Sequence, residues 1–239
     1  MADNVERRNC AAIVWLHSKE CTIDYDIPQM IQYVSVYGIE HVVKVIFSYI
    51  EIFAGAYQNN DLPSARVNFI KKYFGKVDSK YEKLGGLFYS VYRHGLIHDF
   101  HPKRFDYNNL HYEWQISKGN PEIHLTIFES EDDPKVRILH ISLTKLYKDL
   151  KEAINLYFTD LEKNEEFRNN AGEKVARIQS RYEYKIKPLD YKIKSKKKKK
   201  VVENELNKVI EIELYTNDES SRSYISPSEL EYLKSLESE

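Results

Sequence analysis

The stretch IEHVVKVIFSYIEIFAGAY, residues 39–57, is the longest apolar segment of the chain and decides what the rest of the fold must pack against. Its apolar side chains share one face at helical spacing: Val42, Val43, Ile46, Ile50 and Phe53. Lys44 and Glu51 interrupt the segment, which therefore falls short of the roughly 18 apolar residues that a membrane span needs. It predicts a buried helix in the core of a soluble protein, with no membrane partner.

The composition supports a soluble protein with a sizeable core. Hydrophobic residues make up 42% of the 239 residues and charged residues 31%, and the mean hydropathy is −0.60. This length predicts one domain with appendages, or two small domains. The chain has 36 Lys and Arg against 37 Asp and Glu, which excludes a uniformly basic nucleic-acid coat but allows a local basic site.

The N-terminus and the cysteines indicate where the protein works. The short apolar run 11–16 is not a signal peptide. Cys10 and Cys21 are too few for a disulfide scaffold or a four-cysteine zinc site. We therefore expect a reducing, cytoplasmic setting.

More helices are expected on both sides of residues 39–57. Residues 1–38 are ambiguous, because Pro28 interrupts a weak helical spacing. A second helix is predicted from Asp61, as its N-cap, to about Phe74, with Gly75 as its end. A third begins near Val77 or Asp78 and leads directly into RHGLIHDFHPK, residues 93–103.

The pattern then changes to alternation, which predicts three strands in an antiparallel meander at about 111–141. The alternating residues are Tyr112, Trp114 and Ile116, then Ile123, Leu125 and Ile127, then Val136, Ile138 and His140. A long helix is expected from about Ser142 to Phe167, continuing to about Tyr184. Its stripe is Leu143, Leu146, Leu150, Ile154, Tyr157 and Leu161.

The C-terminal extension, residues 171–239, has a basic first part and an acidic second part. Residues 171–200 carry twelve Lys and Arg against three Asp and Glu, whereas residues 201–239 carry three against ten. A solvated arm is one interpretation, and a phosphate-attracting strip beside a binding site is the other. A short terminal helix is predicted with Ser226 as its N-cap.

Residues 93–103 hold the one dense cluster of catalytic-type side chains. Three of the eight histidines lie there, and Arg93 and His98 form the pattern R-x4-H. Histidine titrates near neutral pH and acts as acid or base, and arginine binds two phosphate oxygens at once. Attack of an RNA 2′-hydroxyl on its phosphate needs such a set and no metal. Arg104 and His111 form a second match, R-x6-H, but in a loop that enters a strand.

The string FYSVYRHGLIH, residues 88–98, at the end of an amphipathic helix and before a long later helix, resembles the R-x4-6-H signature of the HEPN superfamily (higher eukaryotes and prokaryotes nucleotide-binding domains). The resemblance covers roughly residues 39–170, with the predicted β insertion inside it, and leaves out 1–38 and 171–239. It implies a mainly α fold, a HEPN-like helical bundle. It also implies a homodimer, and this agrees with geometry: Arg93 and His98 lie about 140° apart around one helix, so two facing copies serve one phosphate better.

The function that this resemblance implies is a metal-independent endoribonuclease, a toxin or defence effector with an antitoxin or regulatory protein as its partner. Arg93 and His98 would be catalytic, and His94 would position the phosphate or orient Arg93. Tyr89, Tyr92 and Lys103 are expected to contact the substrate, and no cofactor is expected.

Other interpretations remain open. The chain is alternatively a non-catalytic HEPN-like module that binds a nucleotide, a nucleic acid or a protein. Arg93 would then pair with Asp99, Glu82 or another acidic residue, and His98 would be a core-edge residue. Metal binding is a third possibility, with His94, His98 and His101 as ligands and Asp99 and His111 as possible extra ligands.

Overall fold

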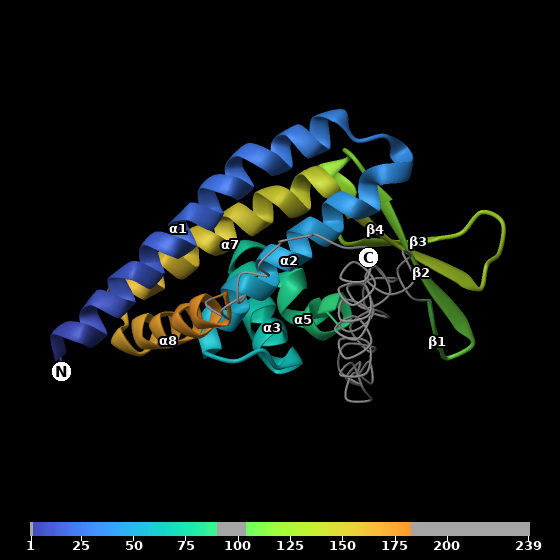
Figure 1. Ribbon diagram of the computed structural model, residues 1–239. Helices are drawn as coiled ribbons and strands as arrows, with labels where there is room; N and C mark the ends of the chain where they lie inside the picture. The colour runs from blue at the N-terminus through green and yellow to red at the C-terminus, as the bar shows by residue number, and fades with distance from the viewer. Residues whose placement is uncertain (1, 90–103, 183–239) are drawn as a thin grey trace, which may run out of the picture. The chain divides into compact units, whose positions relative to one another are not determined.

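The computed structural model describes residues 2–89 and 104–182, which are mainly helical with one small mixed sheet (Figure 1). The α-helices are α1 (Ala2–Tyr33), α2 (Ile39–Gln58), α3 (Pro63–Phe69), α4 (Gly75–Val77), α5 (Ser79–Leu87), α7 (Leu143–Lys163) and α8 (Glu165–Tyr182). The 3₁₀-helices are η1 (Val36–Gly38) and η4 (Pro121–Ile123), and η2 (Ile70–Phe74) is a π-helix. The strands are β1 (Phe105–Tyr107), β2 (Leu110–Ser117), β3 (Thr126–Glu129) and β4 (Val136–Ser142). The described residues up to Arg177 form one compact unit, and the description that follows concerns this unit.

Helix α2 is the predicted central helix. All five residues of its predicted stripe are buried, which confirms this element. It packs against α1, α3 and α7, and α1, α2 and α7 lie side by side along much of their lengths (Figure 1). No helix within residues 2–89 and 104–182 combines the length and the apolar character that crossing a membrane requires.

Helix α1 resolves the ambiguity of residues 1–38. It runs through Pro28 without ending there. Its buried face is Ala12, Leu16, Ile23 and Ile27, at helical spacing. Because Pro28 lacks only one backbone donor, the packing of this face against α2 and α7 outweighs the loss of a single hydrogen bond.

The second predicted helix has different ends. Its N-cap is Leu62 rather than Asp61, and the Asp61 carboxylate instead accepts a hydrogen bond from Lys174 of α8. Gly75 does not end it, since its φ of −59° is right-handed and the chain stays helical to Val77. Asp78 ends the run with extended backbone and caps α5 by accepting from the Lys80 N–H at 2.9 Å. Glycine suits position 75 because Glu82 of α5 packs against it, with only 3.1 Å between an added Cβ and the Glu82 Cβ.

The predicted meander is wrong in its topology. The sheet has four strands in the order β1-β2-β4-β3, and β2 pairs with β4 in parallel. β3 and β4 form an antiparallel hairpin, in which β4 inserts between β2 and β3. Alternation marks which residues are strands, but it carries no information about which strand lies beside which.

The long C-terminal helix of the prediction is two helices. Asn164 has extended backbone (φ −123°, ψ 112°) and separates α7 from α8. Its side-chain oxygen accepts from the Glu166 N–H at 2.9 Å, so it caps α8. The stripe predicted for α7 is buried along its whole length, and Ser142 caps α7 at its N-terminus.

The tyrosines divide between core and surface. Tyr73, Tyr81, Tyr112 and Tyr157 are fully buried, whereas Tyr25, Tyr33 and Tyr37 are exposed. Tyr57, Phe69, Tyr73 and Tyr157 meet mostly edge to face, with ring centroids 4.9–6.3 Å apart. Edge-to-face contacts of this kind add to the burial energy of each ring. The abundance of tyrosine is therefore partly explained by core packing.

Helices α1 and α8 approach closely at Gly172. A Cβ built there lies 2.0 Å from the Oδ1 atom of Asn9, whose side chain is held by a 2.8 Å hydrogen bond to Asn169. No side chain larger than hydrogen fits without displacing Asn9. Glycine is thus required at position 172 by contact, not by backbone conformation.

We predict that Gly172→Ala lowers the free energy of unfolding by about 1–3 kcal/mol, because the added methyl group displaces Asn9. Without that contact the substitution would raise helix stability by up to about 1 kcal/mol. The sign of the change in the free energy of unfolding therefore shows whether the contact exists. Gly119→Ala, in the bend after β2, is the control for replacing a glycine without a contact, since an added Cβ there meets nothing within 4 Å. Urea denaturation followed by circular dichroism measures both variants, and a stabilised Gly172→Ala protein would contradict the contact.

Candidate functional site

Most of the predicted site lies outside the described residues. Arg93, His94 and His98, and with them Tyr92 and Lys103, fall in the range 90–103. Their predicted roles stay predictions. The structure describes the chain up to Tyr89 and again from Arg104.

Tyr89 is the predicted substrate contact that the structure does describe. It is 8% exposed, and the Arg66 guanidinium lies 5.2 Å from its ring centroid. Arg66 in turn lies 3.9 Å from a Glu51 carboxylate oxygen. A cation above a ring that is largely removed from water makes a favourable contact. The Tyr89 ring is thus engaged within the protein and presents little surface to solvent.

Both residues of the second R-x6-H match contact an acidic side chain. Arg104 Nε lies 3.2 Å from a Glu113 carboxylate oxygen, and His111 Nδ1 lies 2.6 Å from Asp106 Oδ1. Asp106 and His111 are direct cross-strand partners of β1 and β2. These contacts indicate that Arg104 and His111 have a structural role in the sheet.

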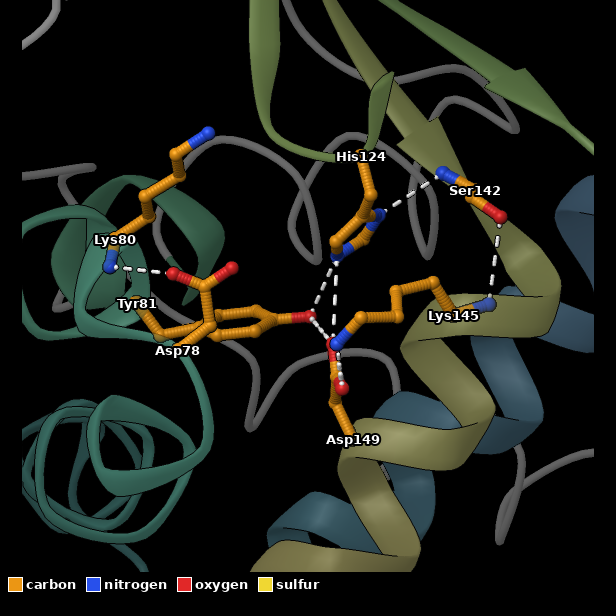
Figure 2. A network of polar contacts seen from close by, with 7 residues as sticks. All are labelled: Asp78, Lys80, Tyr81, His124, Ser142, Lys145 and Asp149. Carbon is orange, nitrogen blue, oxygen red and sulfur yellow. Dashed lines mark hydrogen bonds and ion pairs between the residues drawn. The ribbon is translucent and has the colours of Figure 1, made fainter. Parts of the chain in front are cut away.

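The polar cluster that the structure does bring together was not predicted. It consists of Tyr81 from α5, His124 just before β3, Ser142 at the end of β4, and Lys145 and Asp149 from α7; we call it the Tyr81 network (Figure 2). Tyr81 is fully buried, and the side chains of His124 and Asp149 are 1% and 2% exposed. Lys145, at 30%, reaches solvent.

The hydrogen bonds determine which nitrogen of His124 carries the proton. The backbone N–H of Ser142 donates to His124 Nδ1 at 3.0 Å, so Nδ1 holds a lone pair. The proton of the neutral ring is therefore on Nε2, which donates to the Tyr81 hydroxyl oxygen at 2.7 Å. That hydroxyl donates to Asp149 Oδ2 at 2.9 Å, and Lys145 donates to Asp149 Oδ1 (Figure 2).

Burial shifts the pKa values of the three buried side chains in this network, those of Tyr81, His124 and Asp149. It lowers the pKa of His124 to about 3, helped by the positive charge of Lys145, so the ring is neutral at physiological pH. The 3.7 Å approach of His124 Nε2 to Asp149 is thus not an ion pair. Burial also raises the pKa of Asp149, opposed by its hydrogen bond from Lys145, and raises the pKa of Tyr81 well above its usual range.

The chemistry open to the Tyr81 network is therefore orientation rather than catalysis. Each of the three buried side chains already has its hydrogen-bond partners, and a reaction needs an acid or base that a substrate can reach. The network joins α5, the loop before β3 and the first turns of α7. It holds in place the helix that leads, in sequence, to residues 90–103.

Two members of this network can be recognised from the sequence, although hydrophobic spacing alone does not indicate them. Asp149 lies one residue before Leu150 on the buried face of α7, where a carboxylate needs a partner. Lys145 lies four residues earlier and supplies one. Nothing local indicates that Tyr81 and His124 meet them, because 68 and 25 residues separate these from Asp149.

The metal alternative has no support among residues 2–89 and 104–182, where no group of three or more His, Cys, Asp and Glu side chains could hold an ion. Of the ligands considered for it, His111 pairs with Asp106, and the other four lie in the range 90–103. Comparison with protein-family models, with curated proteins and with solved structures found no match.

We predict that Tyr81→Phe lowers the free energy of unfolding by about 2–4 kcal/mol, because it leaves buried groups of both His124 and Asp149 without a partner. Tyr157→Phe is the control: this ring is equally buried, and its hydroxyl has no hydrogen-bond partner in the described part of the chain. Loss of that hydroxyl should change stability by less than about 1 kcal/mol. Equal effects of the two variants in chemical denaturation would refute the network.

His124 should make the protein lose stability in mild acid. Its pKa is about 3 in the folded protein and near 6.5 when unfolded, so the unfolded chain binds more protons between these values. Stability from this group is complete above about pH 6.5 and falls with pH by up to about 1.4 kcal/mol per unit.

The measurement is the free energy of unfolding of wild-type protein and of His124→Gln between about pH 7 and 4. We expect a shallower decline for the variant. The raised pKa of Asp149 works in the opposite direction in both proteins, so the difference between them isolates His124. Parallel profiles would show that His124 titrates normally.

Proposed function

We propose that this protein is a metal-independent endoribonuclease of the HEPN type, acting as a homodimer. The observation that carries the proposal is the pair Arg93 and His98, spaced R-x4-H, with His94 beside them. The helix before them supports it: α5 begins close to the predicted start, just after its N-cap Asp78, and ends at Leu87, six residues before Arg93. The mainly helical fold also agrees with the proposal.

The proposed reaction is attack of a 2′-hydroxyl on the neighbouring phosphorus. One histidine removes the hydroxyl proton, and a second protonates the leaving 5′-oxygen. Two arginines stabilise the negative charge on the phosphate oxygens. A composite site between two copies supplies two residues of each kind, and the products carry a cyclic phosphate and a 5′-hydroxyl.

The biological role that goes with this proposal is that of a toxin or defence effector, restrained by an antitoxin or another regulatory protein. A cytoplasmic RNA pool is its substrate. The basic residues 171–200 would strengthen RNA binding by releasing counterions, and this contribution would weaken as salt rises.

We predict that purified protein cleaves end-labelled RNA in excess EDTA and leaves cyclic phosphate ends. His98→Ala and Arg93→Ala should each lose activity by about 10²-fold or more, since each removes a group that acts in the transition state. His111→Ala is the matched control, because this histidine belongs to the second match and pairs with Asp106. It should keep full activity.

Two results would redirect the interpretation. Full cleavage by His98→Ala would show that the catalytic site does not lie at residues 93–98. RNA binding without cleavage, unchanged in His98→Ala and abolished when the lysines at 196–200 are replaced by glutamine, would support the non-catalytic binding module instead.

A further inference from the structure

A second candidate site lies away from the Tyr81 network, between the N-terminal turns of α1 and the start of α8. A partly open cavity of about 430 Å³ is found there. This volume is in the range typical of small-molecule sites. Val5 and Ile13 of α1 supply the apolar part of its lining.

Charges of both signs surround this cavity without neutralising each other. Glu6 of α1 and Glu165 of α8 line it together with Arg168 of α8. Within the described residues, neither carboxylate lies within ion-pair distance of Arg168 or of another cation. Arg168 Nη1 donates to the carbonyls of Leu161 and Glu162, at 3.0 and 2.9 Å, where α7 ends. Arg168 is thereby held in place, with Nε and Nη2 free of hydrogen bonds to described residues.

An amide pair completes the polar lining. Asn9 is 7% exposed and donates to Asn169 Oδ1 at 2.8 Å, and both residues line the cavity. The oxygen of Asn169 is occupied by this bond, whereas its amide N–H groups donate to no described residue. Asn169 thus adds donors next to Arg168, and an acceptor on the ligand is their complement.

We propose that this cavity binds a small zwitterion, a free α-amino acid with an aliphatic side chain. Its carboxylate binds Arg168 and the Asn169 amide, and its ammonium group binds between Glu6 and Glu165. Its side chain packs on Val5 and Ile13. Glu6 and Glu165 are exposed and Arg168 is half-buried. A zwitterion is the ligand whose two charges both meet an opposite charge of the lining, whereas a ligand with a single charge meets only one.

Two cysteines of α1 provide the test. Cys10 lines the cavity, whereas Cys21 lies eleven residues along the same helix and does not, and both are exposed. The rate of alkylation at each is measured by mass spectrometry of the native protein with and without L-leucine. At ten times its Kd, leucine should slow alkylation of Cys10 about tenfold and leave Cys21 unchanged.

Ligand analogues separate the two charges of leucine. 4-Methylpentanoate lacks the ammonium group and 3-methylbutylamine lacks the carboxylate, while both keep the aliphatic chain. At the concentration at which leucine protects, neither should protect Cys10. Equal protection by either analogue would overturn the zwitterion assignment, as would an unchanged Cys10 rate in leucine at tens of millimolar.

Variants test the same assignment from the protein side. Glu165→Gln should abolish most of the protection by leucine, because it removes one partner of the ammonium group. Glu166→Gln is the matched control, since this neighbouring glutamate is exposed like Glu165 but does not line the cavity. Full protection retained in Glu165→Gln would refute the proposal. The readout is independent of RNA cleavage.

Discussion

A carboxylate removed from water is unfavourable by several kcal/mol unless hydrogen-bond donors and a counter-charge replace its hydration, and Asp149 is in this position on the buried face of α7. Its two oxygens are satisfied by Tyr81 and Lys145. Tyr81 in turn satisfies the Nε2–H of His124, and the Ser142 N–H satisfies Nδ1. Three segments therefore have to meet at once, which links the small sheet to the helices.

The same burial makes the Tyr81 network a structural feature and leaves catalysis to other residues. The Tyr81 network uses side chains of catalytic type, but burial keeps His124 neutral and closes its nitrogens to any substrate. The side chains proposed for cleavage of RNA follow α5 in sequence instead. A rigid α5 is useful for such chemistry, because a reactive group acts efficiently only when its supporting elements fix its position.

The two R-x4-6-H matches show why a spacing pattern needs its structural context. Arg104 and His111 satisfy the pattern, yet each is paired with an acidic residue of the sheet. By contrast, the cavity between α1 and α8 has no recognisable sequence pattern, and its charges are unpaired among the described residues.

The sequence by itself determined the elements whose signals are local. The stripes of α2 and α7 depend on residues within one or two turns, and both were predicted, as were the approximate starts of α5 near Asp78 and of α7 near Ser142. Tertiary contacts decided the rest. They carry α1 through Pro28, keep Gly75 helical, place β4 between β2 and β3, and unite Tyr81 with His124 and Asp149. Each of these outcomes depends on a partner distant in the chain, and propensity and periodicity describe only a residue's neighbours in sequence.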